Sequence, residues 1–399
     1  MSRPVGDVTG LRIAHVIESD GPGGAERVLA QLSTALQASG AYNVAFLPAD
    51  REGWLARQLE GSGVTIEYFR LERRVSRERR VSPACARSLE AAFRRHRIGV
   101  AHSHEFMMAV YGAWASWRAG VPHVITMHGS SYYAGRLRRR LALRAAIALS
   151  GHTVAVSGRL ARQISRDLWM PPSRISTIPN GVPSVRPERT TLRDELRLGP
   201  DDRLVVSVGN LYPVKGHQYL IDAVALLVGR HPTLHLAISG RGEMAEALSA
   251  RARGLGLANR VYLLGLRSDV AAILAAADVF ALPSLSEGLP LALLEAMFAG
   301  CPIVASEVGE VGVALAHGEA GILVEPGQPA ALAAALDRLL SDPDRARELG
   351  EHAVRRAAAE YDISRMVQRY AGVYEALLGR RRPLARAARA ADASLTGTR

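Results

Sequence analysis

Short apolar runs alternate with longer amphipathic segments along most of this chain. In the first half, this pattern predicts strands over residues 11–17, 44–47, 64–68, 100–101, 123–127, 154–156 and 175–178. Apolar residues at spacings of three and four predict helices between them, as in 25–38 and 160–168. Strands that alternate with helices form parallel sheets covered on both faces, so the fold class is α/β.

The alternation stops once and then resumes. Prolines and a glycine cluster over 179–187, which indicates a linker. Strands follow over 204–208, 234–238, 261–264, 279–282, 303–305 and 322–324, then helices over 330–340, 345–358 and 363–378. We therefore predict two doubly wound domains, 1–182 and 183–361, with a helix over 362–379 that returns to the first and a disordered or surface-bound tail over 380–399. A ligand is expected at the carboxyl ends of the strands, in a cleft between the domains.

Composition narrows the class of protein. The 399 residues are 48% hydrophobic, which is enough for two buried cores. The first ten residues lack the apolar core of a signal peptide, and no apolar run is long enough to span a bilayer. Cys85 and Cys301 are far apart in sequence, which favours a reducing compartment over a disulfide framework. These features predict a cytoplasmic protein.

Positive charge is abundant and uneven. The formal net charge is +12, and arginines crowd 70–97, 136–144 and 380–389. Such patches attract the phosphates of anionic lipids or nucleic acids, although an arginine-rich genome and a solvated face give the same pattern. Aromatic residues make up only 5%, and no nucleic-acid-binding motif is present, so we expect no nucleic-acid partner. Lys215 is the only lysine among the 50 basic residues.

The first candidate motif is the glycine-rich segment 21–26, which follows a predicted strand and opens a helix. Gly23 and Gly24 would let a ligand approach the backbone, where free N–H groups favour a diphosphate. The segment lacks the last glycine of the dinucleotide fingerprint, and a plain tight turn is the alternative interpretation.

The second motif places the single lysine at the end of a strand. Gly209 and Asn210 follow the strand over 204–208, and Lys215 stands at the start of the next helix. A cation is unfavourable at a helix N-terminus unless it serves a ligand, and an ammonium group suits phosphate oxygens. The alternative is an ordinary surface lysine.

The third motif, over 283–297, contains two glutamates. Glu287 lies in the loop after the strand over 279–282, beside the N–H groups of Gly288 and Leu289. Pro290 suits the first turn of a helix, and Glu295 lies farther along its otherwise apolar sequence. A carboxylate on such a face needs a partner, and sugar hydroxyls are suitable donors. A capping carboxylate with a structural ion pair is the alternative.

Together these segments resemble the family-four retaining glycosyltransferases. The glutamates of 286–297, separated by seven residues, look like that family's signature, and 23–26, 178–182, 209–216, 308–309 and 321–327 resemble other parts of it. The likeness covers about residues 11 to 378. It implies a GT-B fold of two Rossmann-like domains facing each other, with the donor mostly in the second and the acceptor mostly in the first. It also implies no metal and no cofactor, because the nucleotide sugar is a substrate.

The resemblance assigns roles to individual residues. Glu295 would hold the donor ribose, Glu287 the transferred sugar and Lys215 the leaving diphosphate. Backbone N–H groups of Gly288 and Leu289 would position the sugar or phosphate, and His128 would position the sugar or take part in catalysis. Further donor contacts would come from Gly23, Gly24, Gly209 and Asn210. Gly240 and Arg241, which follow the strand over 234–238 and open a helix, would also contact the nucleotide, with a simple turn as the alternative.

Other positions are open or depart from the family pattern. His102 and His104 would line the acceptor side, although we expect one of the two to be structural, and a structural role is also open for His128. Many relatives carry arginine where Asn210 stands, and Glu310 replaces a usual glycine.

The predicted activity is therefore transfer, with retention, of a hexose-type sugar from a UDP- or GDP-linked donor. The acceptor would be lipid-linked, a polysaccharide or a glycolipid, at the inner membrane surface, where basic patches of the first domain would contact anionic lipid. A non-transferring GT-B enzyme, such as a nucleotide-sugar epimerase or hydrolase, is the alternative.

Overall fold

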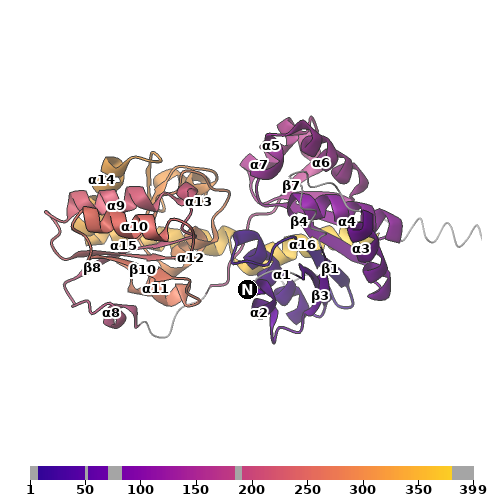
Figure 1. Ribbon diagram of the computed structural model, residues 1–399, viewed down its shortest axis with the longest axis horizontal. Coiled ribbons are helices and arrows are strands. Elements are labelled where there is room, and N and C mark those ends of the chain that lie inside the picture. The colour runs from indigo at the N-terminus through magenta and orange to yellow at the C-terminus, as the bar shows by residue number, and fades with distance from the viewer. Residues whose placement is uncertain (1–7, 50–52, 71–82, 185–190, 380–399) are drawn as a thin grey trace, which may run out of the picture. The chain divides into compact units, whose positions relative to one another are not determined.

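The computed structural model describes residues 8–49, 53–70, 83–184 and 191–379 (Figure 1). It divides into two compact units. The first comprises the chain up to Asn180 together with the chain from Ile363 onward, and the second is Gly181–Asp362. The tail over 380–399 and the arginines between 73 and 80, for which we made predictions above, lie outside the described residues.

The first unit is built on a parallel sheet with the strand order β3-β2-β1-β4-β5-β6-β7. Its strands are β1 (Arg12–Val16), β2 (Tyr42–Pro48), β3 (Thr65–Phe69), β4 (Val100–His104), β5 (His123–Met127), β6 (His152–Ala155) and β7 (Ile175–Thr177). Its helices are α1 (Gly24–Ala38), α2 (Trp54–Leu59), α3 (Pro83–Arg95), α4 (Glu105–Ala119), α5 (Ser131–Ala134), α6 (Leu137–Leu149), α7 (Gly158–Asp167) and α16 (Ile363–Gly379), with a 3₁₀ turn at Pro172–Arg174. Helices α3, α4 and α6 pack on one face of the sheet, and α1, α2 and α16 on the other.

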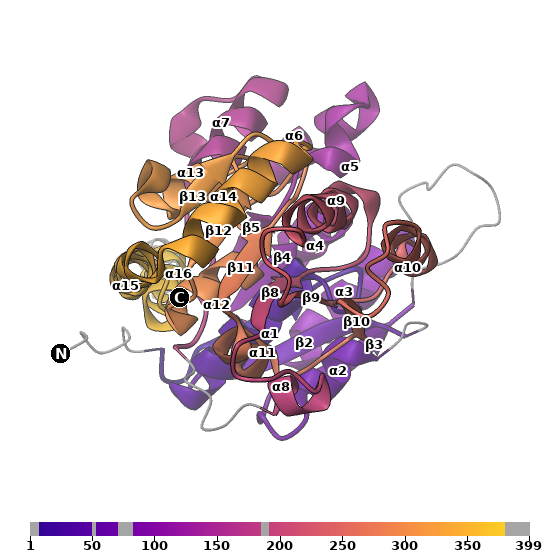
Figure 2. The ribbon, with the colours of Figure 1, turned by 90° about the vertical axis from the view of Figure 1, so that its left-hand side faces the viewer.

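The second unit repeats the same plan with the strand order β10-β9-β8-β11-β12-β13, which can be followed across the sheet in Figure 2. Its strands are β8 (Arg203–Val208), β9 (Leu234–Ser239), β10 (Val261–Gly265), β11 (Val279–Leu282), β12 (Ile303–Ser306) and β13 (Ile322–Val324). Its helices are α8 (Leu192–Glu195), α9 (His217–Leu227), α10 (Ala245–Gly254), α11 (Val270–Ala276), α12 (Leu291–Ala299), α13 (Val311–Ala314), α14 (Pro329–Ser341) and α15 (Pro343–Glu360), with 3₁₀ turns at Pro213–Lys215 and Ala316–Gly318.

The strands form where the apolar runs predict them. Each predicted strand is present, and its ends agree with the prediction within two residues except in β4. That strand continues through His102, Ser103 and His104, which are polar but fully buried. The hydrophobic pattern stops at Ala101 because these last three side chains are held by polar partners rather than by apolar packing.

The chain passes between the units at two points that lie side by side. The backbone N–H of Val182 donates to the carbonyl of Tyr361 at 2.9 Å, and Val182 pairs with Asp362 in an isolated parallel bridge. The linker predicted over 179–187 therefore begins at this boundary. In the described part of the chain, no helix is both long and apolar enough to cross a bilayer.

Candidate active site

The candidate site of the second unit lies where the strand order reverses. Strands β8 and β11 are neighbours, but the chain leaves β8 toward β9 on one side and leaves β11 toward β12 on the other. Loops that leave such a point diverge at the carboxyl ends of the strands and open a crevice there, which is the usual ligand site of doubly wound sheets. Lys215 follows β8 and Glu287 follows β11, so the two predicted residues flank this point.

The structure joins these two side chains directly. Lys215 Nζ donates to Glu287 Oε1 at 2.7 Å, and Ser284 Oγ donates to the same oxygen at 2.7 Å. The Glu287 side chain is only 7% exposed, whereas that of Lys215 is 26% exposed. An ammonium group has three N–H donors, so Lys215 keeps donor capacity for an anion while Glu287 fixes its position.

A glycine lets the two loops approach closely enough for this pair to form. Gly216 adopts a left-handed conformation with φ of 66°, and a Cβ atom there would lie 2.1 Å from the carbonyl oxygen of Pro283. The backbone N–H of Leu285 also donates to the carbonyl of Val214 at 2.8 Å. The loops after β8 and β11 are thus locked together through their backbones.

The predicted residues after β9 join the same region. The backbone N–H of Leu211 donates to the carbonyl of Arg241 at 2.8 Å, and a Cβ atom on Gly240 would lie 2.0 Å from the carbonyl oxygen of Gly209. Buried His217 approaches that oxygen with its Nε2 at 3.3 Å, and burial lowers the pKa of its imidazole to about 4. Gly209 and Arg241 therefore lie together, with Asn210 next in the chain and the Arg241 side chain largely exposed.

The remaining donor residues lie along the segment after β11. The backbone N–H of Glu310 donates to the carbonyl of Gly288 at 3.0 Å, and a Cβ atom on Gly309 would lie 2.1 Å from the carbonyl oxygen of Glu287. Leu289 is buried, and Glu295 is half-buried in the second turn of α12. We had predicted Pro290 in the first turn of this helix, but it is the N-cap, and the helix begins at Leu291.

In the first unit, the glycine-rich loop leads into α1 as the sequence predicts. Gly23 is the N-cap of the helix, and Gly24 is its first residue. A Cβ atom on Gly23 would lie 2.2 Å from Glu26 Oε2, so the Glu26 carboxyl group occupies the space beside this helix end. Burial raises the pKa of Glu26, and a hydrogen bond from Ser19 partly opposes that effect.

His128 follows β5 and is partly exposed at the carboxyl edge of the first sheet. Its Nε2 lies 3.2 Å from Nδ1 of His104, and its packing lowers its pKa to about 4. Its backbone N–H donates to the carboxyl group of Glu105, whose pKa burial raises to about 8. Glu105 is held at φ of 66°, a strained conformation for a residue with a side chain, directly after His104. His102 and His104 are both fully buried.

Sequence reasoning missed several of these contributors. Ser284 stands three residues before Glu287 within the recognised motif, so its hydroxyl could have been proposed as a partner of the carboxylate. Gly216 carries the familiar signal of glycine before a helix. Nothing in the sequence signals the left-handed backbone of Glu105 or its bond to the backbone of His128.

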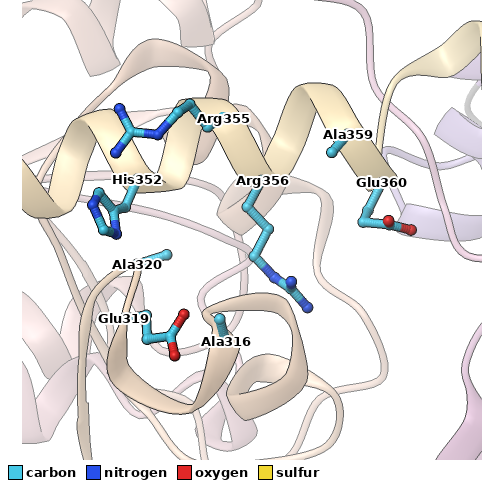
Figure 3. A pocket seen from close by; sticks show the side chains of 8 residues that line it. All are labelled: Ala316, Glu319, Ala320, His352, Arg355, Arg356, Ala359 and Glu360. Carbon is cyan, nitrogen blue, oxygen red and sulfur yellow. The ribbon is translucent and has the colours of Figure 1, made fainter.

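A shallow pocket elsewhere in the second unit contains none of the predicted residues. It measures about 290 Å³ and lies between α15 and the turn over 316–320 (Figure 3). Arg356 at its wall already donates to the carbonyls of Ala314 and Val313, at 2.7 and 2.6 Å. Its guanidinium group therefore stabilises the fold through these hydrogen bonds.

Comparisons with known proteins agree with this geometry. The family model described as "Glycosyl transferases group 1" matches residues 188–356, and that described as "Glycosyltransferase Family 4" matches residues 22–186. A D-inositol 3-phosphate glycosyltransferase of Thermobispora bispora is 33% identical over 315 residues, which are 73% of each chain. One of Acidothermus cellulolyticus is 34% identical over 310 residues, 72% of this chain and 69% of its own.

Solved structures show the same fold. HepE of Anabaena in complex with UDP-glucose has a TM-score of 0.79 at 24% identity, with 92% of this chain and 100% of that chain covered. Sucrose-phosphate synthase of Thermosynechococcus elongatus has a TM-score of 0.74 at 21% identity, with 92% and 99% covered. The two Rossmann-like units, the family models and the relatives lead to one conclusion: this chain belongs to the family-four glycosyltransferases and has the GT-B fold.

Proposed function

We propose that this enzyme transfers a hexose-type sugar, with retention and without a metal ion, from a UDP- or GDP-linked donor to a phosphate-bearing or lipid-linked acceptor. The observation that carries the proposal is the Lys215–Glu287 pair at the strand-order reversal of the second unit. A cation beside a nearly buried carboxylate suits a substrate that has phosphate oxygens next to sugar hydroxyls.

In the proposed reaction, the bond between the anomeric carbon and the diphosphate oxygen breaks, and the acceptor oxygen forms a new bond to that carbon. The electron pair of the broken bond stays on the diphosphate, where Lys215 stabilises the added negative charge from a fixed position. The acceptor hydroxyl loses its proton to the leaving phosphate on the same face of the sugar. Glu287 accepts hydrogen bonds from sugar hydroxyls, Glu295 binds the ribose, and His128 orients the sugar.

The acceptor class follows from the relatives and from charge. The curated relatives named above act, by their names, on D-inositol 3-phosphate, so a phosphorylated polyol is one acceptor to test. A lipid-linked acceptor is the other, because α6 carries exposed Leu137 and Leu141, 60% and 51% exposed, next to exposed Arg136 and Arg138. Basic and apolar side chains on one helix face favour binding to an anionic membrane surface.

Fewer arginines of the 136–144 cluster are available to contact lipid than the sequence suggests. Arg139 stacks on Tyr132 at 4.0 Å, and Arg140 donates to the carbonyl of Ala134 at 2.8 Å. Arg144 donates to the carbonyl of Trp169 at 2.6 Å. These three guanidinium groups support the fold, so the lipid contact would rest on Arg136 and Arg138.

The direct test is a donor panel with and without acceptor. Purified protein is incubated with UDP-glucose, UDP-N-acetylglucosamine or GDP-mannose, together with inositol 3-phosphate or a membrane extract, in buffer containing a chelator. We expect one donor to be consumed only when an acceptor is present. Consumption without acceptor would instead support the hydrolase or epimerase alternative, and dependence on added metal would contradict metal-independent transfer.

The single lysine permits a second test that needs no variant. An amine-reactive reagent can modify only Lys215 and the terminal α-amino group of the chain, and mass spectrometry distinguishes the two. We expect the correct nucleotide sugar to slow modification of Lys215 while the α-amino group reacts at an unchanged rate. Equal rates at Lys215 with and without a donor that the enzyme turns over would refute the phosphate-binding role.

Membrane binding is tested with vesicles of neutral lipid and of lipid containing phosphatidylserine. We expect the protein to sediment only with the anionic vesicles. High salt and the double variant Leu137→Ser, Leu141→Ser should each reduce the fraction of protein that sediments. Leu226→Ser, at a leucine on α9 that is 62% exposed, is the matched control. Equal binding of all three proteins would exclude α6 as the contact.

A further inference from the structure

Three buried histidines gather on the face of the first sheet that α1 and α16 cover. His15 on β1 is the register partner of His102 on β4, and His104 follows two residues later on the same face. All three are fully buried, and one ring nitrogen from each lies within 4.8 Å of the other two. Histidine is a frequent ligand of metal ions, so the state of each nitrogen decides what this cluster can bind.

The hydrogen bonds of His15 leave one nitrogen ready to act as a ligand. Its Nε2 lies 3.1 Å from Oδ1 of Asn43, and a carbonyl oxygen can only accept, so Nε2 carries the proton. The amide orientation of Asn43 is fixed because its Nδ2 donates to Gln37 Oε1 and to the carbonyl of Ala41, each at 3.2 Å. Nδ1 of His15 then holds a lone pair, and it is buried with no hydrogen-bond partner among the described residues.

His104 also has one buried ring nitrogen without a hydrogen-bond partner among the described residues. Its Nδ1 lies 3.2 Å from Nε2 of His128, while its own Nε2 is buried with no partner in the described part of the chain. When Nδ1 donates to His128, Nε2 presents a lone pair. Leaving two buried ring nitrogens unsatisfied costs free energy, and a cation that accepts both lone pairs would remove that cost.

His102 is the third ligand available. Its Nδ1 and Nε2 each lie 2.7 Å from a hydroxyl, of Tyr374 and Thr126 respectively. It can bind a cation by giving up one of these hydroxyls. The hydroxyl of Thr126 keeps a second partner in that of Tyr370, at 3.0 Å, so the exchange would not isolate it.

We propose that His15, His102 and His104, with His15 Nδ1 and His104 Nε2 as the nitrogens that lack partners, form a three-histidine site for a borderline-soft divalent cation, best fitted by Zn²⁺. Ligands that are all imidazoles favour zinc over magnesium or calcium, which prefer oxygen. Zinc–nitrogen bonds of about 2 Å require the ligand nitrogens to lie roughly 3.3 to 4 Å apart, so any pair near the 4.8 Å limit would have to close by about 1 Å. The hydrogen bond that His15 Nε2–H donates to Asn43 Oδ1 is the outer contact that fixes such a ligand.

A cation at this site would also affect His128 through His104. It would fix the tautomer of His104, so that its Nδ1–H donates to His128 Nε2, which lies 3.2 Å away. The site therefore orients a residue of the proposed reaction without taking part in the transfer.

The test uses the intact chain, loaded with ZnCl₂ and then washed with a weak chelator. We expect one zinc per chain by elemental analysis and a first shell of imidazole nitrogens by X-ray absorption at the zinc edge. At a free zinc concentration 100 times its Kd, the folding equilibrium shifts about 100-fold. No retained zinc, or a first shell of oxygen only, would overturn the proposal even if the variants below failed to fold.

Variants locate the site. His104→Gln and His15→Gln are expected to lose the zinc, and Asn43→Leu to weaken its binding roughly 10- to 100-fold through loss of the outer hydrogen bond. The matched control is His123→Gln on β5, because His123 is equally buried but both its nitrogens are bonded, at 2.7 Å to Ser150 and 2.9 Å to Ser103. Zinc retained by His104→Gln, or lost equally from the control, would place the ion elsewhere.

Discussion

Acid should unfold the first unit because several of its buried or partly buried histidines are neutral in the folded protein. Burial lowers the pKa of His15 to about 4, of His123 to about 3 and of His128 to about 4. In the unfolded chain each has a pKa near 6.5. Because the folded pKa is lower, these residues contribute stability that is present above pH 6.5 and lost as the pH falls from 6.5 toward the folded pKa.

The slope of this effect can be worked out. Each histidine that is protonated only on unfolding lowers the free energy of unfolding by up to about 1.4 kcal/mol per pH unit, so these three together contribute up to about 4 kcal/mol per unit. His102 and His104, whose pKa values burial also lowers, add to the same slope. Glu105 acts in the opposite direction, because a folded pKa of about 8 keeps it protonated where the unfolded carboxyl group is ionised. It offsets about one histidine between pH 4.5 and 8.

This slope is large compared with the stability of a domain, which is typically about 5–15 kcal/mol. We therefore expect the first unit to unfold within about two pH units below 6.5. The second unit should respond less, since His217 and His235 are its only described histidines for which burial lowers the pKa.

The chain offers a clean probe of this difference. Its four tryptophans, Trp54, Trp114, Trp117 and Trp169, all lie in the first unit. Urea unfolding in metal-free buffer, followed by tryptophan fluorescence from pH 7.5 to 5, reports that unit, while far-UV circular dichroism reports both. His123→Gln should reduce the fluorescence-detected slope by up to about 1.4 kcal/mol per pH unit, with the full effect below about pH 5.5. A free energy of unfolding that stays constant over this range would refute neutral burial of these rings.

Three further outcomes are expected. Gly216→Ala should destabilise the second unit and weaken donor binding, because the new Cβ atom clashes with the neighbouring loop in addition to straining the backbone. Gly256→Ala, at a similar φ with no neighbour within 4 Å, is the control and should cost only the backbone strain of about 1–2 kcal/mol. Equal effects of the two variants in circular dichroism and donor titration would contradict this expectation. Glu287→Gln should lower kcat/KM roughly 10- to 100-fold in the donor assay, since hydrogen bonds to charged groups are worth about 1.5–3 kcal/mol, and unchanged kinetics would remove it from the site. Tyr374→Phe should destabilise the first unit by about 1–3 kcal/mol in fluorescence-monitored unfolding, because it leaves a ring nitrogen of His102 unsatisfied; a stability equal to that of the parent would show that the bond contributes little.

The sequence predicts the framework of this fold well for a physical reason. Strands of a parallel sheet buried on both faces consist of consecutive apolar residues, so the runs over 204–208 and 279–282 mark β8 and β11 almost to the residue. Their order in the sheet follows from the doubly wound pattern, and that order brings Lys215 and Glu287 to one edge. The pairing of these two side chains could therefore be anticipated from their places after the strands.

Local backbone geometry was harder to predict from the sequence. Helix α12 begins one residue after Pro290 because the proline takes an extended conformation, with ψ of 131°, and serves as the cap. Glu105 takes a left-handed conformation that its residue type disfavours. Such conformations are imposed by surrounding contacts rather than by the residue itself, so residue propensities alone predict the commoner backbone conformation.

The two units also differ in how far their chemistry can be recognised from motifs. In the second unit, the groups that meet are carried by compact segments, because a loop after a strand holds both the glycine that permits close approach and the charged side chain. In the first unit, the polar groups meet across the sheet: His102 is bonded to Tyr374, which lies 272 positions later in the chain, and His15 is bonded to Asn43 on the next strand. His15, Asn43 and Tyr374 are unremarkable in their own segments, and the segment that carries His102 does not signal its bond to Tyr374. A buried polar network of this kind is specified only by the fold, so the metal site that we propose could be recognised only once the strands are placed side by side.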